Sequence, residues 1–294
     1  MSRRGWLLFA AMAVLWGMPY LFIKEAVASF TPAAVVAGRT TLGALLLLPV
    51  ALRKGALRPA VAHWRWVLAF GAIEMAGPFL MLSYAEQTLP SGLTGLLVAT
   101  VPLFGAVTAF LLGDRLALGP KRLIGLVVGL VGVAVIVSGS NGDGQVDPLN
   151  VAIVLLVAVL YSIAPFVVAR KLGPVPGIGV ATLALGAVAT AYLPVALLTQ
   201  HEMPTGRSIV ALVGLSVICT TIAFVVFFAL IDEVGPAQAT VFTYVNPVVA
   251  LALGIIVLGE TLTTGLIVGF PIVLLGCWLA ASHRDEDPMM VAEP

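Results

Sequence analysis

Two charged side chains lie inside apolar stretches, where a charge is costly. Glu74 is near the middle of an apolar run over residues 65–85, and a charge at the centre of a membrane helix costs about 2.5–3.5 kcal/mol on insertion scales. Such a carboxyl normally faces a cavity or a partner. Glu74 is therefore a candidate to bind a substrate ammonium or a proton. A carboxyl that is hydrogen-bonded to a neighbouring helix is the structural alternative.

Arg39 is the second charge of this kind, roughly a third of the way into the apolar run over residues 33–52. A guanidinium can bind a substrate carboxylate through two parallel hydrogen bonds. It could equally bind backbone carbonyls of the protein, or extend outward so that its charged end reaches the membrane surface. Both the binding role and the structural role stay open for Arg39.

Aromatic and hydroxyl side chains add candidates for a binding cavity. Trp16 and Tyr161 fall near the middle of their apolar runs, whereas aromatic residues of membrane proteins usually collect at the interfaces. Their rings could stack on a solute or fill the core between helices. Thr220 and Tyr84 are weaker candidates for the same lining.

A polar stripe is predicted in the apolar run over residues 237–258. Thr240, Thr243, Tyr244 and Pro247 recur there at a spacing of three to four residues, which puts them on one face of an α-helix. In a membrane such a face points toward a cavity or another helix. Pro247 and Pro102 also interrupt helical hydrogen bonding, so they are candidate hinges, although simple kinking is the alternative.

The composition indicates that these candidates sit in a membrane protein. Of the 294 residues, 61% are hydrophobic and 10% charged, whereas soluble domains carry about 25% charged residues. The net charge of +1 argues against a nucleic-acid partner, which needs a concentrated basic surface. Cys219 and Cys277 both lie in apolar runs, and we interpret them as buried thiols.

Ten segments are long and apolar enough to span a bilayer, which needs about 20 residues per helix. They cover about residues 6–24, 33–52, 65–85, 91–112, 121–139, 148–169, 177–198, 208–231, 237–258 and 263–282. The sequence thus predicts an all-α polytopic membrane protein with ten transmembrane helices, in a lipid bilayer.

The basic residues predict the orientation, because cytoplasmic connections are enriched in Lys and Arg. With the N-terminus placed in the cytoplasm, 12 of the 15 basic residues fall on the cytoplasmic side. These are Arg3, Arg4, Arg53, Lys54, Arg58, Arg65, Arg115, Lys121, Arg122, Arg170, Lys171 and Arg284. Both termini are therefore expected in the cytoplasm.

Weak internal repeats divide the chain into two halves, residues 1–140 and 141–294. The matches, at offsets of 144–146 residues, are Leu15-Trp16-Gly17 with Leu160-Tyr161-Ser162, Leu48–Leu52 with Leu193–Leu197, Pro102 with Pro247, Gly113–Leu116 with Gly259–Leu262, and Gly125 and Gly132 with Gly269 and Gly276. Five segments per half reverse the second half, so the halves form inverted repeats. Inverted repeats are typical of transporters that work by alternating access.

The ordered motifs resemble the EamA family of the drug/metabolite transporter superfamily. The resemblance covers residues 5–282 and rests on Val14-Leu15-Trp16-Gly17, Arg39, Pro102 and Gly259-Glu260-Thr261-Leu262. It implies a carrier of the bacterial inner membrane, often an exporter of amino acids or related metabolites. Because one fold serves many substrates, the resemblance does not select a particular solute.

Other classes of protein fit the sequence less well. An intramembrane enzyme is disfavoured, since the histidines do not meet within the membrane and no HExxH metal motif occurs. We expect neither a cofactor nor a bound metal, and we expect a monomer. A passive facilitator or channel for small organic solutes remains the alternative to a secondary transporter, and a sensor or scaffold subunit is disfavoured.

Overall fold

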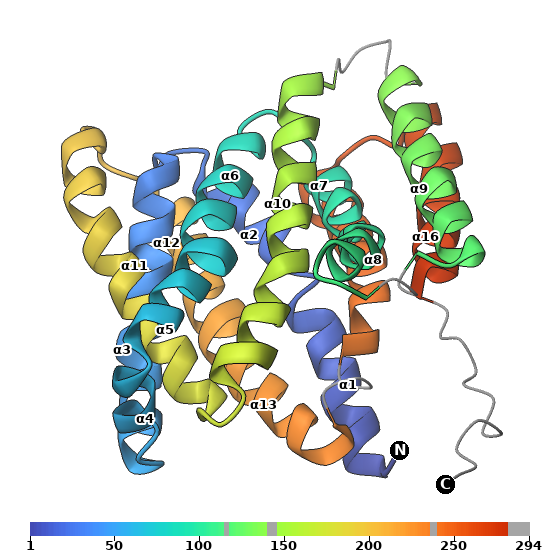
Figure 1. Cartoon of the computed structure of the whole chain (residues 1–294). Coiled ribbons are helices and arrows are strands. Elements are labelled where there is room, and N and C mark those ends of the chain that lie inside the picture. Colours follow the sequence, from blue (N-terminus) through green and yellow to red (C-terminus); the bar gives the residue numbers. More distant parts are fainter. Residues whose placement is uncertain (115–117, 140–145, 236–239, 282–294) are drawn as a thin grey trace, which may run out of the picture.

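The computed structural model describes residues 1–114, 118–139, 146–235 and 240–281, and in this part of the chain the regular elements are helices (Figure 1). The first half contains α1 (Arg3–Leu15), α2 (Pro19–Ala26), α3 (Pro32–Arg53), α4 (Leu57–Ala62), α5 (Trp64–Gly71), the π-helix η1 (Ala72–Ala76), α6 (Gly77–Ala85), α7 (Ser91–Val98), α8 (Val101–Leu111) and α9 (Pro120–Ser138). The second half contains α10 (Pro148–Val167), the π-helix η2 (Val168–Leu172), α11 (Gly177–Thr199), α12 (Gly206–Ser216), the π-helix η3 (Val217–Ile222), α13 (Ala223–Val234), the 3₁₀-helix η4 (Thr240–Tyr244), α15 (Asn246–Leu258) and α16 (Thr264–Ala281).

These helices join into segments that we number in chain order. Segments 1 to 5 are α1–α2, α3, α5–η1–α6, α7–α8 and α9, and segments 6 to 10 are α10–η2, α11, α12–η3–α13, η4–α15 and α16. Within the described residues, segments 1 to 8 are long and apolar enough to cross a membrane, and two shorter apolar helices cover 242–258 and 264–280. The prediction of an all-helical membrane protein is confirmed, and the count of ten spanning helices stays a prediction.

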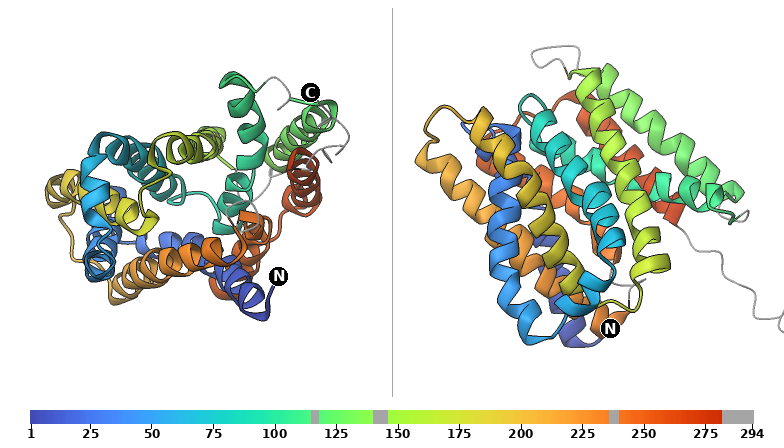
Figure 2. Two further views of the ribbon diagram at one scale, coloured as in Figure 1. Left: turned by 60° about the horizontal axis from the view of Figure 1, so that its bottom comes forward. Right: turned by 60° about the vertical axis from the view of Figure 1, so that its left-hand side comes forward.

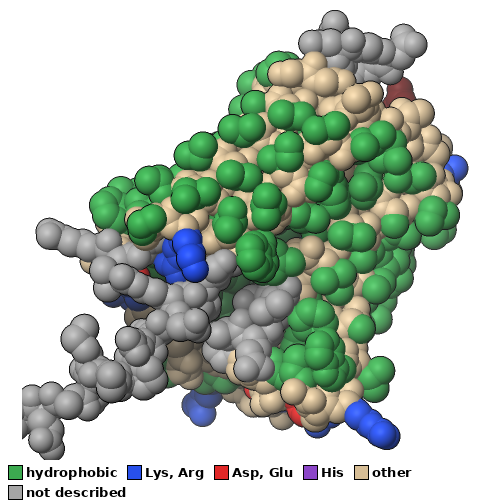
Figure 3. Space-filling view, turned by 90° about the vertical axis from the view of Figure 1, so that its right-hand side faces the viewer, with side chains coloured by type: hydrophobic (Ala, Val, Ile, Leu, Met, Phe, Trp, Pro, Cys, Tyr) green, Lys and Arg blue, Asp and Glu red, His purple; other side chains and the backbone are tan. Residues whose placement is uncertain are grey.

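Large apolar side chains point outward along these helices. Leu111, Leu198 and Ile256 are 76%, 74% and 79% exposed. On the face formed by α9 and α16, hydrophobic side chains cover most of the surface and charged side chains occur in small groups (Figure 3). A surface of this kind is stable against lipid, because lipid tails do not penalise exposed apolar groups.

Local sequence signals explain where several helices begin. The Thr31 hydroxyl accepts a hydrogen bond from the Ala34 N–H, and Pro32 is the first residue of α3. Asp147 caps α10 in the same way, and Pro148 follows it. Side-chain caps satisfy free N–H groups of the first turn, and proline in that turn needs no hydrogen bond.

The helices pack lengthwise as a bundle, and α9 and α16 lie side by side at one edge (Figure 2). Glycines allow their close approach. A Cβ at Gly125 would lie 2.6 Å from the Ala280 nitrogen, and a Cβ at Gly276 would lie 2.7 Å from the Gly125 oxygen. The small-residue motifs Gly125-xxx-Gly129 and Gly265-xxx-Gly269 thus serve packing within the chain.

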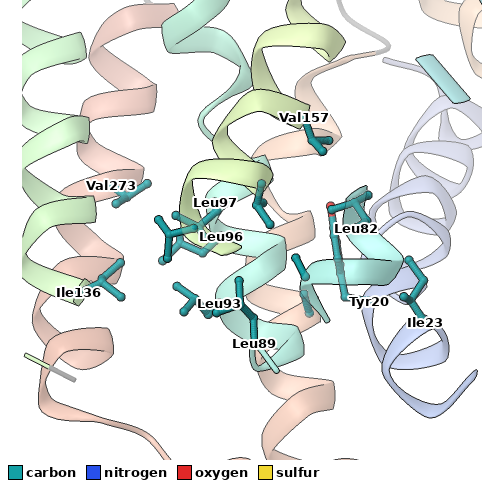
Figure 4. Close-up of a cluster of buried hydrophobic side chains, with 14 of the residues drawn as sticks. Tyr20, Ile23, Leu82, Leu89, Leu93, Leu96, Leu97, Ile136, Val157 and Val273 are labelled. Carbon is teal, nitrogen blue, oxygen red and sulfur yellow. The ribbon is translucent and has the colours of Figure 1, made fainter. Parts of the chain in front are cut away.

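The largest hydrophobic cluster joins segments from both halves. Tyr20 and Leu82 lie close together, and Leu96 of α7 lies between them and the pair Ile136 and Val273 (Figure 4). A second cluster packs α3 and α11 against segment 3. The core therefore ties the two halves together instead of forming two separate domains.

Interruptions of helical structure occur at matched positions in the two halves. The π-helices η1 and η3 begin at Ala72 and Val217, which are 145 residues apart. The helices α8 and α15 begin at Val101 and Asn246, again 145 residues apart. This offset equals that of the sequence repeats.

The most extensive contacts between helices join a segment of the first half to a segment of the second half. Segments 2, 4 and 5 pack on their own counterparts 7, 9 and 10, through α3 with α11, α7 with α15, and α9 with α16. Segment 1 packs on segment 8 through α2 and α12, and segment 3 packs on segment 6 through α6 and α10. If each segment is replaced by its counterpart in the other half, the pair 1–8 becomes the pair 6–3, and the pairs 2–7, 4–9 and 5–10 are unchanged. The five contacts are therefore the same after the halves are exchanged.

Candidate functional site

Arg39 is buried at the contact between segments 2, 3 and 8. The side chain is 7% exposed, its Nε donates a 2.9 Å hydrogen bond to the Thr220 hydroxyl, and its guanidinium carbon lies 3.7 Å from the centre of the Phe79 ring. The outward extension considered for Arg39 is therefore wrong. Within the described part of the chain, its two terminal nitrogens make no hydrogen bond.

Thr220 meets Arg39 because segment 8 contains a π-helix at that point. The Thr220 hydroxyl donates to the carbonyl of Leu215, five residues earlier, and accepts from Arg39. Gly43 in α3 permits the close approach, since a Cβ there would lie 2.9 Å from a methyl carbon of Thr220. π-helical turns often occur at functional sites of helices, and Thr220, a weak candidate from sequence, binds Arg39, one of the two intramembrane charges.

Glu74 lies in the matching π-helix, η1 of segment 3. The residue is partly buried, and no ion pair of its carboxylate is present among the described residues. Tyr161 is close enough to interact electrostatically with Glu74, Arg39 and Tyr20. Tyr161 is therefore near both intramembrane charges that the sequence singled out.

Trp16 has a different environment from Tyr161, although the two are related by the repeat. Its ring packs against Phe224, Phe227 and Phe242, with ring centres at 6.1, 4.8 and 5.5 Å. It lies at the break between α1 and α2, in a separate small hydrophobic cluster. These contacts agree with the alternative in which the Trp16 ring fills the core between helices.

The stripe predicted along segment 9 does not form one regular α-helical face. Thr243 and Tyr244 end the 3₁₀-helix η4, and Pro247 lies in the first turn of α15, which begins at Asn246. A 3₁₀-helix has 3.0 residues per turn instead of 3.6, so the prediction of a single helix face is wrong. The side chain of Thr240 lies outside the described residues.

The remaining candidates are distributed around this region. Tyr244 packs against the largest hydrophobic cluster, and Tyr84 is 48% exposed. Pro102 and Pro247 each lie in the first turn of a helix, α8 and α15. Both prolines thus mark matched breaks in segments 4 and 9.

Sequence reasoning missed several residues that the fold brings to Arg39 and Glu74. Tyr20 is 7% exposed and lies within electrostatic range of Arg39 and Tyr161. Phe79 supplies the ring beneath the guanidinium. The spacing of Phe79 after Glu74, five residues within one predicted helix, was the available signal for Phe79, whereas Tyr20 had none.

A second polar cluster lies at the end of the bundle where α6 leads into α7 and α15 leads into α16 (Figure 1). The Glu260 carboxylate accepts hydrogen bonds from the N–H groups of Ser91 at 2.6 Å and Gly92 at 3.1 Å. Glu260 thus caps α7, a helix of the other half. Lys24 lines a pocket together with Glu260.

Apolar helices long enough to cross a bilayer, which enclose a buried Arg39, define a polytopic helical membrane protein. The chain belongs to the EamA-like transporter family, whose model matches residues 3–138 and again residues 149–282. It is therefore a membrane transporter, and the resemblance inferred from its motifs is confirmed.

Several relatives are similar over most of their length. The "Uncharacterized inner membrane transporter YedA" of Escherichia coli K12 is 30% identical, covering 86% of this chain and 82% of the relative. The "Probable terminal-alkyne amino-acid exporter" of Streptantibioticus cattleyicolor is 25% identical, covering 95% and 93%. A solved crystal structure with 22% identity superposes with a TM-score of 0.64 over 94% of this chain and 96% of that one, which supports the fold alone.

Proposed function

We propose that this protein is a secondary transporter that exports amino acids or related small metabolites across the bacterial inner membrane by alternating access. The observation that carries the proposal is the state of Arg39. One of its nitrogens is held by Thr220, while the two terminal nitrogens are uncommitted among the described residues. A buried guanidinium in this state suits a carboxylate, which two parallel hydrogen bonds would hold.

The neighbours of Arg39 favour a solute that also carries an ammonium group. Tyr161 lies within electrostatic range of both Arg39 and Glu74, so a cation and a carboxyl of the protein are both near this phenol. A zwitterionic amino acid would direct its carboxylate to Arg39 and its ammonium to Glu74. Compensation of both charges offsets the cost of burying each of them.

Alternating access is supported by the relation between the halves. The breaks in segments 3 and 8 and in segments 4 and 9 share one offset, and exchange of the halves preserves the main contacts. Inverted repeats that move around a shared central site are a known basis for such transport. Pro102 and Pro247 are the proposed hinges, and both termini are proposed to be cytoplasmic.

The direction of transport is proposed as export. A relative of 25% identity is named as a probable exporter of an amino acid, and the relation extends over nearly the whole of both chains.

Transport assays in proteoliposomes test the substrate class. We expect uptake of some zwitterionic amino acids, and no uptake of the matching amines without a carboxylate or acids without an ammonium. Arg39→Gln should abolish this uptake, whereas the control Arg207→Gln, which removes a largely exposed partner of Glu25, should retain it. Failure of every amino acid to move, or undiminished uptake by Arg39→Gln, would overturn the proposal.

A further inference from the structure

Glu86 is a fully buried carboxyl directly after α6, at the end of the bundle that also holds Lys24 and Glu260. Among the described residues, neither of its carboxyl oxygens has a hydrogen-bond partner. Buried polar groups are nearly always hydrogen-bonded. An unpartnered carboxyl in this position therefore requires an explanation.

The two cations near Glu86 donate their hydrogen bonds to other groups and not to its carboxyl. The Lys24 ammonium, from α2, donates hydrogen bonds to the backbone oxygens of Glu86 at 2.8 Å and Leu89 at 2.9 Å. Arg39, from α3, is within electrostatic range but donates to Thr220. Neither cation forms an ion pair with the Glu86 carboxyl among the described contacts, so its charge is not directly neutralised.

The other titratable neighbours do not stabilise a charged Glu86. Glu260, from the turn between α15 and α16, carries a like charge and is bound to the N–H groups of Ser91 and Gly92. Tyr20, from α2, is the remaining titratable group that faces Glu86. A second carboxylate nearby disfavours ionisation of the first.

Removing the charge is the simplest way to accommodate this carboxyl. An ionised carboxylate buried without partners is costly, and such groups usually become neutral instead. Burial raises the pKa of Glu86 well above its ordinary value, with an opposing effect from the Lys24 ammonium and an added upward effect from Glu260. The carboxyl is thus suited to hold a proton at a higher pH than a solvent-exposed glutamate does.

A pocket of about 310 Å³ lies at the same end of the molecule. It is lined by Lys24, which binds the Glu86 backbone oxygen, by Glu260, and by Thr88 and Pro90 of the turn that follows Glu86. Glu86 itself is fully buried and is not among the lining residues. The pocket lies between residues of both halves. A rearrangement of the halves would therefore change the surroundings of Glu86.

We propose that Glu86 is a proton-binding site that couples the transport cycle to the proton gradient. A proton from the aqueous phase joins the carboxylate to give the neutral acid in this conformation. When the halves move apart at this end, water reaches the group, the charged form is stabilised, and the proton is released. The coupling role rests on the proposed transport function, whereas proton binding does not.

Infrared spectroscopy of the full-length protein in lipid nanodiscs tests proton binding alone. We expect the band of a neutral carboxylic acid at neutral pH, lost in Glu86→Gln and kept in Glu202→Gln, which changes an exposed carboxylate. Glu74→Gln distinguishes the intramembrane acid Glu74 from Glu86, because the Glu86 band should survive it. Absence of any acid band that depends on Glu86 would overturn the proposal.

Transport assays with and without a pH gradient test the coupling. We expect Glu86→Gln to lose the acceleration by a pH gradient while it retains exchange of solute for solute, and Glu86→Asp, which keeps an acid, to retain both. Gradient-driven transport that persists in Glu86→Gln would overturn the coupling role. A wild-type protein that moves no solute but has the Glu86 acid band would overturn the transport function and support the proton site.

Discussion

Arg39 and Glu74 each lack a charged counterpart in the other half, since Ala184 and Cys219 stand 145 residues later. A charge in an apolar run is costly, so both residues could be identified from the sequence as candidates for a functional site. Their surroundings were less predictable, because Thr220 and Tyr161 approach them from segments far along the chain. Glu86 was missed, since a carboxyl at the end of an apolar run is ordinarily solvated, and tertiary packing buries it.

The hydrogen bond from Arg39 to Thr220 should contribute to stability. Thr220→Val keeps the shape of the side chain but removes the acceptor, and hydrogen bonds to charged groups contribute about 1.5–3 kcal/mol. Thr221→Val is the matched control, since its hydroxyl likewise donates to a carbonyl five residues earlier. In thermal unfolding in detergent, Thr220→Val should lower Tm more than Thr221→Val. Equal losses would contradict the role assigned to the Arg39 contact.

The raised pKa of Glu86 predicts how stability depends on pH. Unfolded, the carboxyl has the ordinary glutamate pKa of about 4.3, and burial raises the pKa in the folded protein. Between the two values the folded state holds the extra proton, so this contribution to stability is present at low pH and is lost as pH rises. The stability of Glu86→Gln should therefore not fall with rising pH in this way. Parallel Tm profiles of wild type and Glu86→Gln across this range would contradict the prediction.

Helix ends and breaks differ in how far the sequence predicts them. Prolines in the first turn, joined by capping side chains at two of the helices, predict the starts of α3, α8, α10 and α15. These residues act on the backbone of their own turn, so their effect can be read from the local sequence. The π-helices η1 and η3 have no such signal, since one extra residue in a turn depends on what packs against it. The prediction of a polar stripe in segment 9 was wrong for the same reason. The 3₁₀-helix at the start of that segment changes the number of residues per turn.

The contact between α9 and α16 depends on glycine in both helices. A Cβ on Gly276 would lie 2.5 Å from the Gly129 Cα and 2.7 Å from the Gly125 oxygen, so Gly276→Ala should destabilise the protein by about 1–3 kcal/mol through overpacking. Gly186→Ala, in α11 with no atom near the added Cβ, is the control and should be neutral or stabilising. A thermal unfolding assay with equal Tm values for the two variants would refute the packing role.

At the scale of the whole molecule, composition, apolar length and internal repeats were enough to predict a helical membrane transporter of this family. The pairing of segments could not be predicted, because apolar helices in lipid select partners by shape and not by hydrophobicity. The contact of segment 3 with segment 6 brings Glu74 toward Tyr161, and segment 8 supplies Thr220 to Arg39 of segment 2. The site is thus a property of the two halves combined.

Counterflow in proteoliposomes tests alternating access most directly. Vesicles that contain the wild-type protein are loaded with an excess of an unlabelled amino acid, and entry of a trace of the labelled one is followed. A carrier returns across the membrane faster with solute bound, so we predict transient accumulation of label above the external concentration. Label that only equilibrates, with no effect of the internal load, would contradict alternating access and support a passive channel.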